Sequence, residues 1–416
     1  MTGNMQLGNA PWLSHGEVAR LLAALNRDGE EARVVGGAVR NALLHLAVDE
    51  IDVATTAVPE EVVRRVEAAG WKAVPTGIDH GTITVIIDGK PFEVTTLRED
   101  VETYGRKAKV VFGRDWRTDA ERRDFTVNAL SVSADGRIYD YVGGIEDIAA
   151  RRVRFIGEPA SRIAEDYLRI LRFFRFHAWY GKDHPDAAGL HACILSRTGL
   201  ATLSRERVRM ELLKLLLASH ATPTLAAMAE TGILGMVLGG VPLLASFENV
   251  VKIEAATGVA ADAVRRLGAL AVTVKEDGER LTQRLRLSNA EAERLVALEH
   301  WWRASPDAGD QAAHALLYQV GPQSFSDRVL IAWSRSAAGA ADPAWHNLAT
   351  LPQRWTAPKF PLKAADFTRR GVSPGPALGQ AMRSAEDTWI AADFPADRAA
   401  LEAIAEAAVR DATVVR

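Results

Sequence analysis

Residues 34–56 constrain the fold of this chain more than any other stretch. They read V-V-G-G-A-V-R-N-A-L-L-H-L-A-V-D-E-I-D-V-A-T-T. A short apolar run ends in Gly36 and Gly37, a helical segment over residues 38–46 follows, and a second short strand carries acidic side chains. The two glycines let a ligand approach the backbone closely, the helix start offers free N–H groups, and Arg40 adds a fork of donors. The stretch therefore predicts a phosphate-binding arrangement.

The acidic residues that follow predict a metal site. Alternation along a strand places Glu50 and Asp52 on one face, and Asp49, Ile51 and Val53 on the other. Two carboxylates beside a phosphate cradle can hold divalent cations through their oxygen atoms. A solvated strand end is the ordinary alternative for such a pair alone, but the adjacent G-G-A-V-R run favours metal binding.

A third carboxylate belongs to the same predicted site. Residues 82–87 and 91–97 read as two strands joined by a D-G turn. Apolar residues of the second strand alternate with Glu93, which can face the same site as Glu50 and Asp52. Three carboxylates on adjacent strands suit a two-metal nucleotidyl transfer, in which the cations activate the attacking hydroxyl and neutralise the leaving pyrophosphate.

A second group of polar residues lies in residues 162–176, R-I-A-E-D-Y-L-R-I-L-R-F-F-R-F. This stretch reads as one helix, along one side of which four residues follow at three-residue steps: Asp166, Arg169, Arg172 and Arg175. A carboxylate accepts from the exocyclic amine of cytosine or adenine, and a guanidinium donates to the neighbouring ring acceptor, whereas uracil and guanine present a carbonyl. The pattern indicates selection of a base by protein side chains, with an Asp166–Arg169 salt bridge as the alternative.

Composition bounds the class of protein. The chain has 416 residues, 48% of them apolar and 25% charged, which is ordinary for a soluble globular protein of two to four domains. One cysteine, Cys193, excludes a disulfide framework and fits a cytoplasmic location. The absence of a signal peptide and of an apolar run near 18 residues predicts no membrane association. Because the net charge is −3, an RNA partner requires a local basic face.

Four motifs together resemble a known family. They are G-G-A-V-R-N-A-L-L, E-x-D-V-A-T-T, E-R-R-D-F-T-V-N-A-L at residues 121–130, and E-D-x-x-R-x-x-R-F. This set resembles the bacterial, class II CCA-adding tRNA nucleotidyltransferases and their poly(A) polymerase relatives. The resemblance covers residues 30–220 and, in outline, residues 220–416. It departs from the family pattern twice, since Glu50 replaces the first Asp of Asp-x-Asp and Asn41 replaces the Asp of V-R-D.

The resemblance implies an α+β fold. A polymerase-β-like nucleotidyltransferase head, built from a mixed sheet with helices, precedes an all-α neck, body and tail. The expected domains are an N-terminal helix packed on the head (1–30), the head (31–157), a helical neck for base selection (158–220), and a helical body and tail for tRNA binding (221–416).

The resemblance also implies roles for single residues. Glu50 and Asp52 bind Mg²⁺, and Glu93 is the third catalytic carboxylate. The implied nucleotide contacts are Gly36, Gly37, Arg40, Arg123, Asp124, Asn128, Asp166, Arg169, Arg172 and Arg175. Within this set Asp166 and Arg169 select the base, so CTP and ATP are the expected substrates and tRNA the expected partner.

Other stretches give structural expectations. Residues 12–25 read as an amphipathic helix opened by Ser14. Residues 98–120 are polar and poorly periodic, which predicts a long functional loop. Residues 203–216 read as a helix capped at Ser204, and the chain beyond them reads as a series of helices.

Three other functions stay open at this point. A poly(A) polymerase shares the head and the base-selecting pair but lacks the C steps. A partial enzyme that adds only CC or only A shares nearly every motif. The non-enzyme alternative is a catalytically weakened tRNA- or RNA-binding protein, marked by Asn41 and Glu50, in which replacing Glu50 by Asp raises activity.

Overall fold

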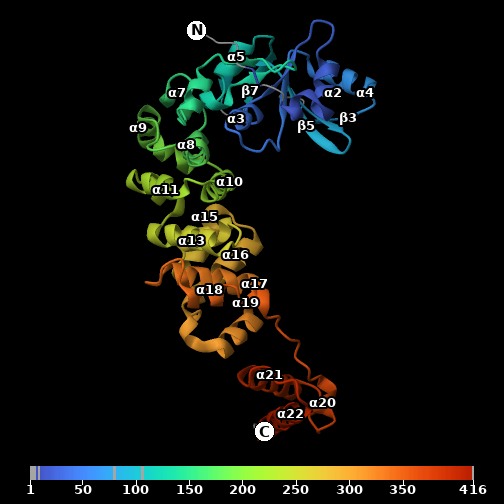
Figure 1. Cartoon of the computed structure of the whole chain (residues 1–416), viewed down its shortest axis with the longest axis vertical. Coiled ribbons are helices and arrows are strands. Elements are labelled where there is room, and N and C mark those ends of the chain that lie inside the picture. The colour runs from blue at the N-terminus through green and yellow to red at the C-terminus, as the bar shows by residue number, and fades with distance from the viewer. Residues whose placement is uncertain (1–5, 8–9, 78–80, 105–106, 415–416) are drawn as a thin grey trace. The chain divides into compact units, whose positions relative to one another are not determined.

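The structure is a computed structural model that describes residues 6–7, 10–77, 81–104 and 107–414. The chain divides into two compact units, Met1–Val237 and Leu238–Arg416. The first unit contains all the strands of the described residues, and the second is helical (Figure 1). The four-domain division expected from the sequence stays a prediction.

A mixed sheet forms the centre of the first unit. Its seven strands in the described residues follow the order β3-β4-β5-β2-β1-β8-β9. Their bounds are β1 Ala32–Val35, β2 Asp52–Thr55, β3 Lys72–Gly77, β4 Thr82–Ile87, β5 Lys90–Thr96, β8 Ser131–Val132 and β9 Ile138–Tyr139. Strands β2 and β5 pair in parallel and the other neighbours pair antiparallel. The mixed α+β head expected from the sequence is thereby confirmed.

Two helices cover the sheet with apolar faces. Helix α2 (Gly16–Leu25) buries Leu21 and Leu22, and α4 (Pro59–Ala68) buries Val62 and Val66. The expectation of one helix over residues 12–25 was wrong, because α1 (Pro11–Ser14) ends before an extended residue at position 15. The Ser14 hydroxyl donates back to Ala10 O, so it closes α1 instead of capping α2.

The long loop expected over residues 98–120 was also wrong. Strands β6 (Arg98–Tyr104) and β7 (Lys107–Phe112) form a two-stranded antiparallel sheet, and α5 (Trp116–Glu121) follows. Residues 105–106 lie outside the described part of the chain. The T-Y and V-V-F runs have high strand propensity, and the charged residues around them hid the pattern.

Helices complete the first unit beyond the sheet. They are α3 Gly37–Leu43, η2 Thr126–Asn128, α6 Gly144–Ala149, α7 Pro159–Glu165, α8 Leu168–Tyr180, α9 Ala187–Ser196, η3 Arg197–Thr202, α10 Arg205–Leu216, α11 Ala221–Glu230 and α12 Ile233–Leu238. Ser204 stands at the N-cap of α10, as expected, but its side chain makes no capping hydrogen bond.

The single helix expected over residues 162–176 is two helices. Asp166 has an extended backbone (φ −156°, ψ 107°) between α7 and α8. Its carboxylate accepts from the N–H of Leu168 at 3.1 Å, which is how an aspartate competes with helical backbone bonding. Asp166 therefore lies at a helix break and not on the same helical face as Arg169.

Aromatic packing fixes α8 against the sheet-containing part of its unit. The rings of Phe173 and Phe176 of α8 lie 5.3–6.3 Å from the ring of Phe125, centroid to centroid. Phe155 lies 5.3 Å from Phe173 and 4.9 Å from Phe125. Phe125, Phe155 and Phe173 are fully buried. Such packing is rigid, so the polar residues of α8 are held in one position relative to strands β1 and β2.

The second unit is built from helices and 3₁₀ turns. They are α13 Leu244–Thr257, α14 Ala263–Ala271, α15 Lys275–Leu285, α16 Asn289–Ala297, η4 Leu298–Arg303, η5 Pro306–Ala308, α17 Gly309–Ser334, α18 Pro343–Ala349, α19 Leu351–Arg354, α20 Ala364–Thr368, α21 Pro376–Ala391 and α22 Arg398–Val414. The all-α character expected there is confirmed, with Ser288 forming a capping box on α16. Within the described residues, no helix is long and apolar enough to cross a membrane.

Candidate active site

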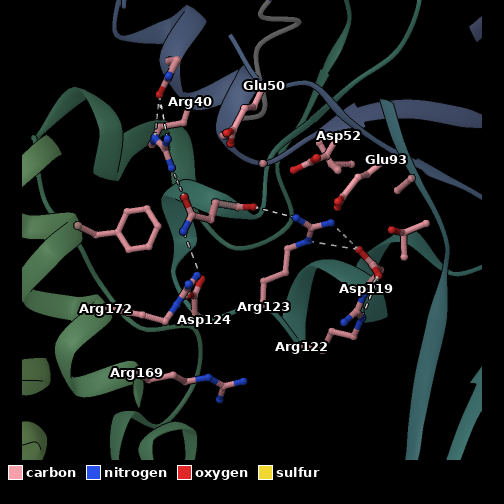
Figure 2. A pocket seen from close by; sticks show the side chains of 18 of the residues that line it. Arg40, Glu50, Asp52, Glu93, Asp119, Arg122, Arg123, Asp124, Arg169 and Arg172 are labelled. Carbon is pink, nitrogen blue, oxygen red and sulfur yellow. Dashed lines mark hydrogen bonds and ion pairs between the residues drawn. The ribbon is translucent and has the colours of Figure 1, made fainter. Parts of the chain in front are cut away.

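Every site residue predicted from the sequence lines one cavity of about 900 Å³ in the first unit. Residues from β1, α3, β2 and β5 form one side of it, and residues from α8 form another. Figure 2 shows Asp52 beside Glu93, Glu50 apart from that pair, and Arg40, Asp124 and Arg172 in a separate row. The fold therefore gathers the predicted residues, while their individual roles stay predictions.

Two of the carboxylates are placed by strand pairing. Asp52 is the first residue of β2 and lies opposite Glu93 of β5 in the parallel register. The apolar neighbours of Glu93 in β5 are buried while Glu93 itself is exposed, as the alternation predicts. The parity argument for Glu50 was wrong, because β2 begins only at Asp52. Without a strand there is no alternation, and Asp49 lines the cavity as well as Glu50.

The electrostatic environment of Asp52 is that of a crowded acidic site. Burial is the largest cause that raises the pKa of Asp52, and the charge of Glu93 raises it further. Glu50 adds a smaller repulsion, whereas Arg123 opposes the shift. The like charges around Asp52 mark a place where a cation would relieve the repulsion.

The donor set suits a hard divalent cation. Asp52, Glu93 and Glu50 supply carboxylate oxygens, which are the ligands that Mg²⁺ prefers in proteins. In the described part of the chain no three His, Cys, Asp or Glu side chains are already grouped to hold a metal ion. Glu50, Asp52 and Glu93 would hold such a cation, which would supply positive charge against their mutual repulsion.

The glycine turn is held by protein contacts. Gly36 has φ +68°, a conformation that L side chains rarely adopt, and a Cβ there would lie 3.3 Å from an Arg123 nitrogen. Its N–H donates to Leu130 O at 2.9 Å. Gly36 is therefore needed for the turn itself, and its N–H is engaged by the protein. Gly37 begins α3 and lines the cavity.

Arg40 braces the cavity wall. Its side chain is buried and donates to Asn41 Oδ1, to Asn128 Oδ1 at 2.5 Å and to the Tyr180 hydroxyl at 2.8 Å. Burial lowers the pKa of Arg40, and the nearby Arg175 acts in the same direction. The guanidinium therefore links α3 to α8, and the phosphate contact expected for it stays a prediction.

Arg123 lies at the carboxylate side of the cavity. It donates to Asp119 and to Asn128 O, each at 3.2 Å for its closest atoms (Figure 2). Asp119 is buried and also pairs with Arg122. Both arginines therefore bond back to α5, and Arg123 is oriented toward the space beside Asp52.

A polar chain connects η2 to α8. Asn128 Nδ2 donates to Asp124 at 3.2 Å, and Arg172 pairs with Asp124 at 2.6 Å. Burial opposes the charge of Arg172, but Asp124 and Glu211 together raise the pKa of Arg172. The guanidinium is thus held charged and in place. Arg175 pairs with Glu211 of α10 at 2.5 Å.

The two residues expected to select the base, Asp166 and Arg169, bond to other residues and not to each other. Asp166 Oδ2 accepts from Arg207 of α10 at 2.6 Å, while Arg169 pairs with Glu165 and donates to Arg162 O. The alternative of an Asp166–Arg169 salt bridge does not describe these contacts. Backbone and Arg207 together fix the plane of the Asp166 carboxylate at the cavity wall.

Sequence reasoning missed several lining residues. Arg207, Tyr180, Asp119 and Lys214 face the cavity but were not predicted as site residues. Arg207 and Lys214 stand in a helix that reads as an ordinary basic face. Only the packing of α10 beside α8 brings Arg207 to Asp166, so no local signal could identify it.

A second cavity of about 960 Å³ shares four acidic lining residues with the first. Both are lined by Asp49, Glu50, Asp52 and Glu93. The second is lined on its other side by residues of α1, α2 and the β4–β5 hairpin, including Trp12 and Lys90. The acidic group therefore faces two spaces, each large enough for a nucleotide-sized group.

Comparison with known proteins identifies the family. Residues 32–154 match the model described as "Poly A polymerase head domain", and residues 191–247 match "Probable RNA and SrmB- binding site of polymerase A". The mitochondrial CCA tRNA nucleotidyltransferase 1 of Danio rerio is 35% identical over 86% of this chain and 83% of its own length. The CCA-adding enzyme of Limosilactobacillus fermentum is 32% identical over 87% and 89%.

Structural similarity agrees with the sequence matches. The crystal structure of the Bacillus stearothermophilus CCA-adding enzyme in complex with CTP superposes with a TM-score of 0.74 at 27% identity. It covers 91% of this chain and 93% of that enzyme. The cytoplasmic location expected from composition stays a prediction, since the animal relative is named as mitochondrial. The chain belongs to the nucleotidyltransferase family of class II CCA-adding enzymes and poly(A) polymerases.

Proposed function

We propose that this chain adds C, C and A to the 3′ ends of tRNA, using CTP and ATP without a nucleic-acid template. The observation that carries this proposal is that two cavities are lined by the same group of carboxylates. A transfer between two substrates needs such a junction, because the attacking hydroxyl and the nucleoside triphosphate must approach from different sides.

The reaction balances as a nucleotidyl transfer. The acceptor 3′-hydroxyl loses its proton to water and its oxygen forms a bond to the α-phosphorus of the incoming nucleotide. The bond from the α-phosphorus to the oxygen that bridges it to the β-phosphorus breaks, and pyrophosphate leaves with that oxygen. Glu50, Asp52 and Glu93 would hold Mg²⁺, which when bound lowers the pKa of the hydroxyl and neutralises charge on the phosphates. Arg123, held beside Asp52, adds positive charge for the triphosphate.

The base would be selected by the cavity wall that α8 and the helix break at Asp166 form. Asp166 is held in one plane by Leu168 N–H and Arg207, and each carboxylate oxygen keeps a second lone pair. It can therefore accept from the exocyclic amine of cytosine or adenine. The side chain of Arg169, which donates to Arg162 O of α7, also donates to the ring acceptor next to that amine. A carbonyl at the amine position would repel the carboxylate, which excludes uracil and guanine.

The test is incorporation of each labelled nucleoside triphosphate into a tRNA transcript that lacks its terminal CCA. Wild type is expected to add two C and one A. Asp166→Ala is expected to lose about 10- to 100-fold of its discrimination against UTP, since one bidentate base contact is worth about 1–3 kcal/mol. Asp186→Ala is the matched control, because Asp186 only caps α9 and should leave base choice unchanged.

Other products would change the assignment. Long A tails without C would indicate a poly(A) polymerase, and addition of only CC or only A would indicate a partial enzyme. No incorporation with Mg²⁺ or Mn²⁺ would reject the enzymatic proposal and favour an RNA-binding role.

A further inference from the structure

Asp119 holds two arginines at the carboxylate side of the first cavity. Its side chain is 5% exposed, and its Oδ1 accepts from Arg122 Nε at 2.9 Å. Its Oδ2 accepts from Arg123 Nη2 at 3.2 Å and from Arg123 Nε at 3.3 Å. All three residues line the cavity, and Figure 2 shows both guanidinium groups bonded to the Asp119 carboxylate. One carboxylate therefore orients two guanidinium groups.

The spacing of the three residues explains this arrangement. Asp119 lies in α5, and Arg122 and Arg123 follow it at the third and fourth positions. Residues at these spacings are neighbours on a helix surface. The backbone continues the turn past the end of α5, since Arg122 N donates to Thr118 O at 3.2 Å. Two successive arginines thus meet at the same carboxylate.

Packing of α5 fixes the position of this group relative to Asp52. Trp116 of α5 belongs to one apolar cluster with Val35 of β1 and Ala54 of β2. Its indole N–H donates to Glu31 Oε2 at 2.8 Å. Because Ala54 stands two residues after Asp52 in β2, the strand that carries Asp52 also provides a contact that holds α5. The arginine pair is therefore placed by the fold itself.

The two guanidinium groups keep N–H donors that the described residues do not use. Each guanidinium has five such donors. Asp119 accepts from two nitrogen atoms of Arg122, Nε and Nη2. It accepts from the same two nitrogen atoms of Arg123, whose Nη1 donates to Asn128 O. Because two guanidinium groups share one carboxylate, the group is also positively charged.

Unused donors and excess positive charge together suit a ligand with several anionic oxygen atoms. Guanidinium groups bind phosphate oxygens in pairs. Along α8 the charges are matched differently, since Arg172 has Asp124 as a partner and Arg175 has Glu211. The terminal phosphates of a nucleoside triphosphate, which leave as pyrophosphate in a nucleotidyl transfer, have the chemistry that the Asp119 group fits.

We propose that Asp119 is a positioning residue that holds Arg122 and Arg123 as a clamp for the terminal phosphates of the incoming nucleotide and for the pyrophosphate that leaves. Asp119 acts through the arginines, because both of its oxygen atoms bond to guanidinium groups. Arg122 is thereby assigned to the phosphate site together with Arg123. This inference rests on the proposed function, which supplies the identity of the ligand.

An amide at position 119 would break the clamp. An Asn side chain has one acceptor oxygen and one N–H₂ donor. The oxygen could keep one arginine, but the donor would face the N–H groups of the other. Asp119→Asn should therefore weaken binding of pyrophosphate and of CTP by about ten-fold each, and leave binding of CMP within about two-fold. CMP carries the same base, ribose and α-phosphate but lacks the terminal phosphates.

The test is equilibrium binding of pyrophosphate, CTP and CMP to the full-length chain with Mg²⁺ and without tRNA, measured by isothermal titration calorimetry. Arg122→Met should weaken pyrophosphate and CTP binding by a similar factor. This variant leaves Asp119 paired with Arg123, so the buried carboxylate stays compensated. In a variant that already carries Arg122→Met and Arg123→Met, Asp119→Asn should not weaken pyrophosphate binding further.

Asp147 offers a matched control. It is buried, and its carboxylate also lies between two arginines, accepting from Arg152 Nε at 2.6 Å and from Arg154 Nε at 3.0 Å. It is not among the described residues that line the first cavity. Asp147→Asn should lower the unfolding temperature, as Asp119→Asn does, but should leave all three affinities within about two-fold. Unfolding temperatures therefore separate loss of folding from loss of the clamp.

Three results would overturn the inference. The first is that wild type does not bind pyrophosphate. The second is that Asp119→Asn leaves pyrophosphate binding unchanged, or weakens CTP and CMP binding equally, as expected of a residue that only supports the fold. The third is that Asp119→Asn weakens pyrophosphate binding just as much when both arginines are already replaced. If wild type adds no nucleotide to tRNA, the proposed function fails, but these binding measurements still decide the role of Asp119.

Discussion

A charged network of the second unit and the acidic group of the first unit differ in how their charges are compensated. In the second unit Arg265, Arg266 and Arg294 pair with Glu254, Asp262 and Asp327 at 2.8–3.4 Å, in a network of alternating signs. In the first unit, burial and Glu93 raise the pKa of Asp52. In the network each carboxylate faces at least one guanidinium, although Glu254 Oε1 and Arg265 Nε are buried without a hydrogen bond. Asp52 faces Glu93 and Glu50, and Arg123 offsets only part of that repulsion, so an added cation would relieve the rest. Unequal charge therefore distinguishes a binding site from a structural network.

The largest expected effect is that of Asp52→Asn. Loss of this carboxylate should lower the single-turnover rate of C addition by about 10⁴-fold, or about 5 kcal/mol of activation free energy. The same substitution should increase the free energy of unfolding, although it lowers the rate. Because the folded-state pKa of Asp52 is raised, the folded chain retains a proton that the unfolded chain has lost, so stability falls as pH rises above about 3.8.

Thermal unfolding at pH 7 checks the second part. The variant should melt at a higher temperature than wild type, whereas Asp135→Asn, which removes an exposed turn carboxylate, should melt slightly lower. A lower melting temperature for Asp52→Asn would remove the contrast between the two units.

A smaller effect is expected when the balanced network is broken. Arg265 is 3% exposed and contacts both Glu254 and Asp327. Arg265→Met would leave two buried carboxylates with less compensation, and should cost about 4 kcal/mol of unfolding free energy. Denaturant unfolding followed by fluorescence measures the loss, and the rate of C addition at a permissive temperature should be unchanged.

An exposed pair provides the control for this variant. Arg369 pairs with Asp366 on α20, and the Arg369 side chain is largely exposed. Arg369→Met should change the unfolding free energy by less than about 1 kcal/mol. Equal losses of unfolding free energy in Arg265→Met and Arg369→Met would mean that burial does not determine how much the network contributes to stability.

The smallest expected effect concerns the buried imidazole of His177. His177 of α8 is buried, and burial is the main cause that lowers the pKa of His177 to about 4, with help from His220 and His184. The unfolded chain takes up this proton below about pH 6.5 and the folded chain does not. Stability is therefore lost as pH falls from 6.5 to 4, by about 3 kcal/mol at most.

Unfolding of His177→Gln across the same pH range tests this origin. The unfolding free energy of the variant should depend less steeply on pH than that of wild type, by the uptake of about one proton. An unchanged slope would show that the loss of stability in acid does not come from His177.

Most of the candidate site was predictable because its parts are local. The glycine turn and the alternation of polar and apolar residues in β5 depend on residues that are close in the chain. The register of β2 and β5 then aligns Asp52 with Glu93. The Ser288 capping box is likewise a local pattern. These features could be read from the sequence since backbone preference and side-chain period act over a few residues.

Tertiary contacts decided what local pattern could not. The helix break at Asp166 is stabilised by Arg207, 41 residues further on, and the ring of Tyr167 fills the space that a Cβ of Gly199 would need. The periodicity of residues 162–176 favours one helix, and distant partners override it.

The sequence by itself thus determined the chemical groups of the site, the α+β head and the helical remainder, because residue types and periods are local properties. Only the tertiary structure decided that Asp166 faces Arg207 and that Arg40 is a brace. The same is true of the balanced network in the second unit. Ion pairs between distant residues depend on packing and desolvation, which no short stretch of sequence specifies.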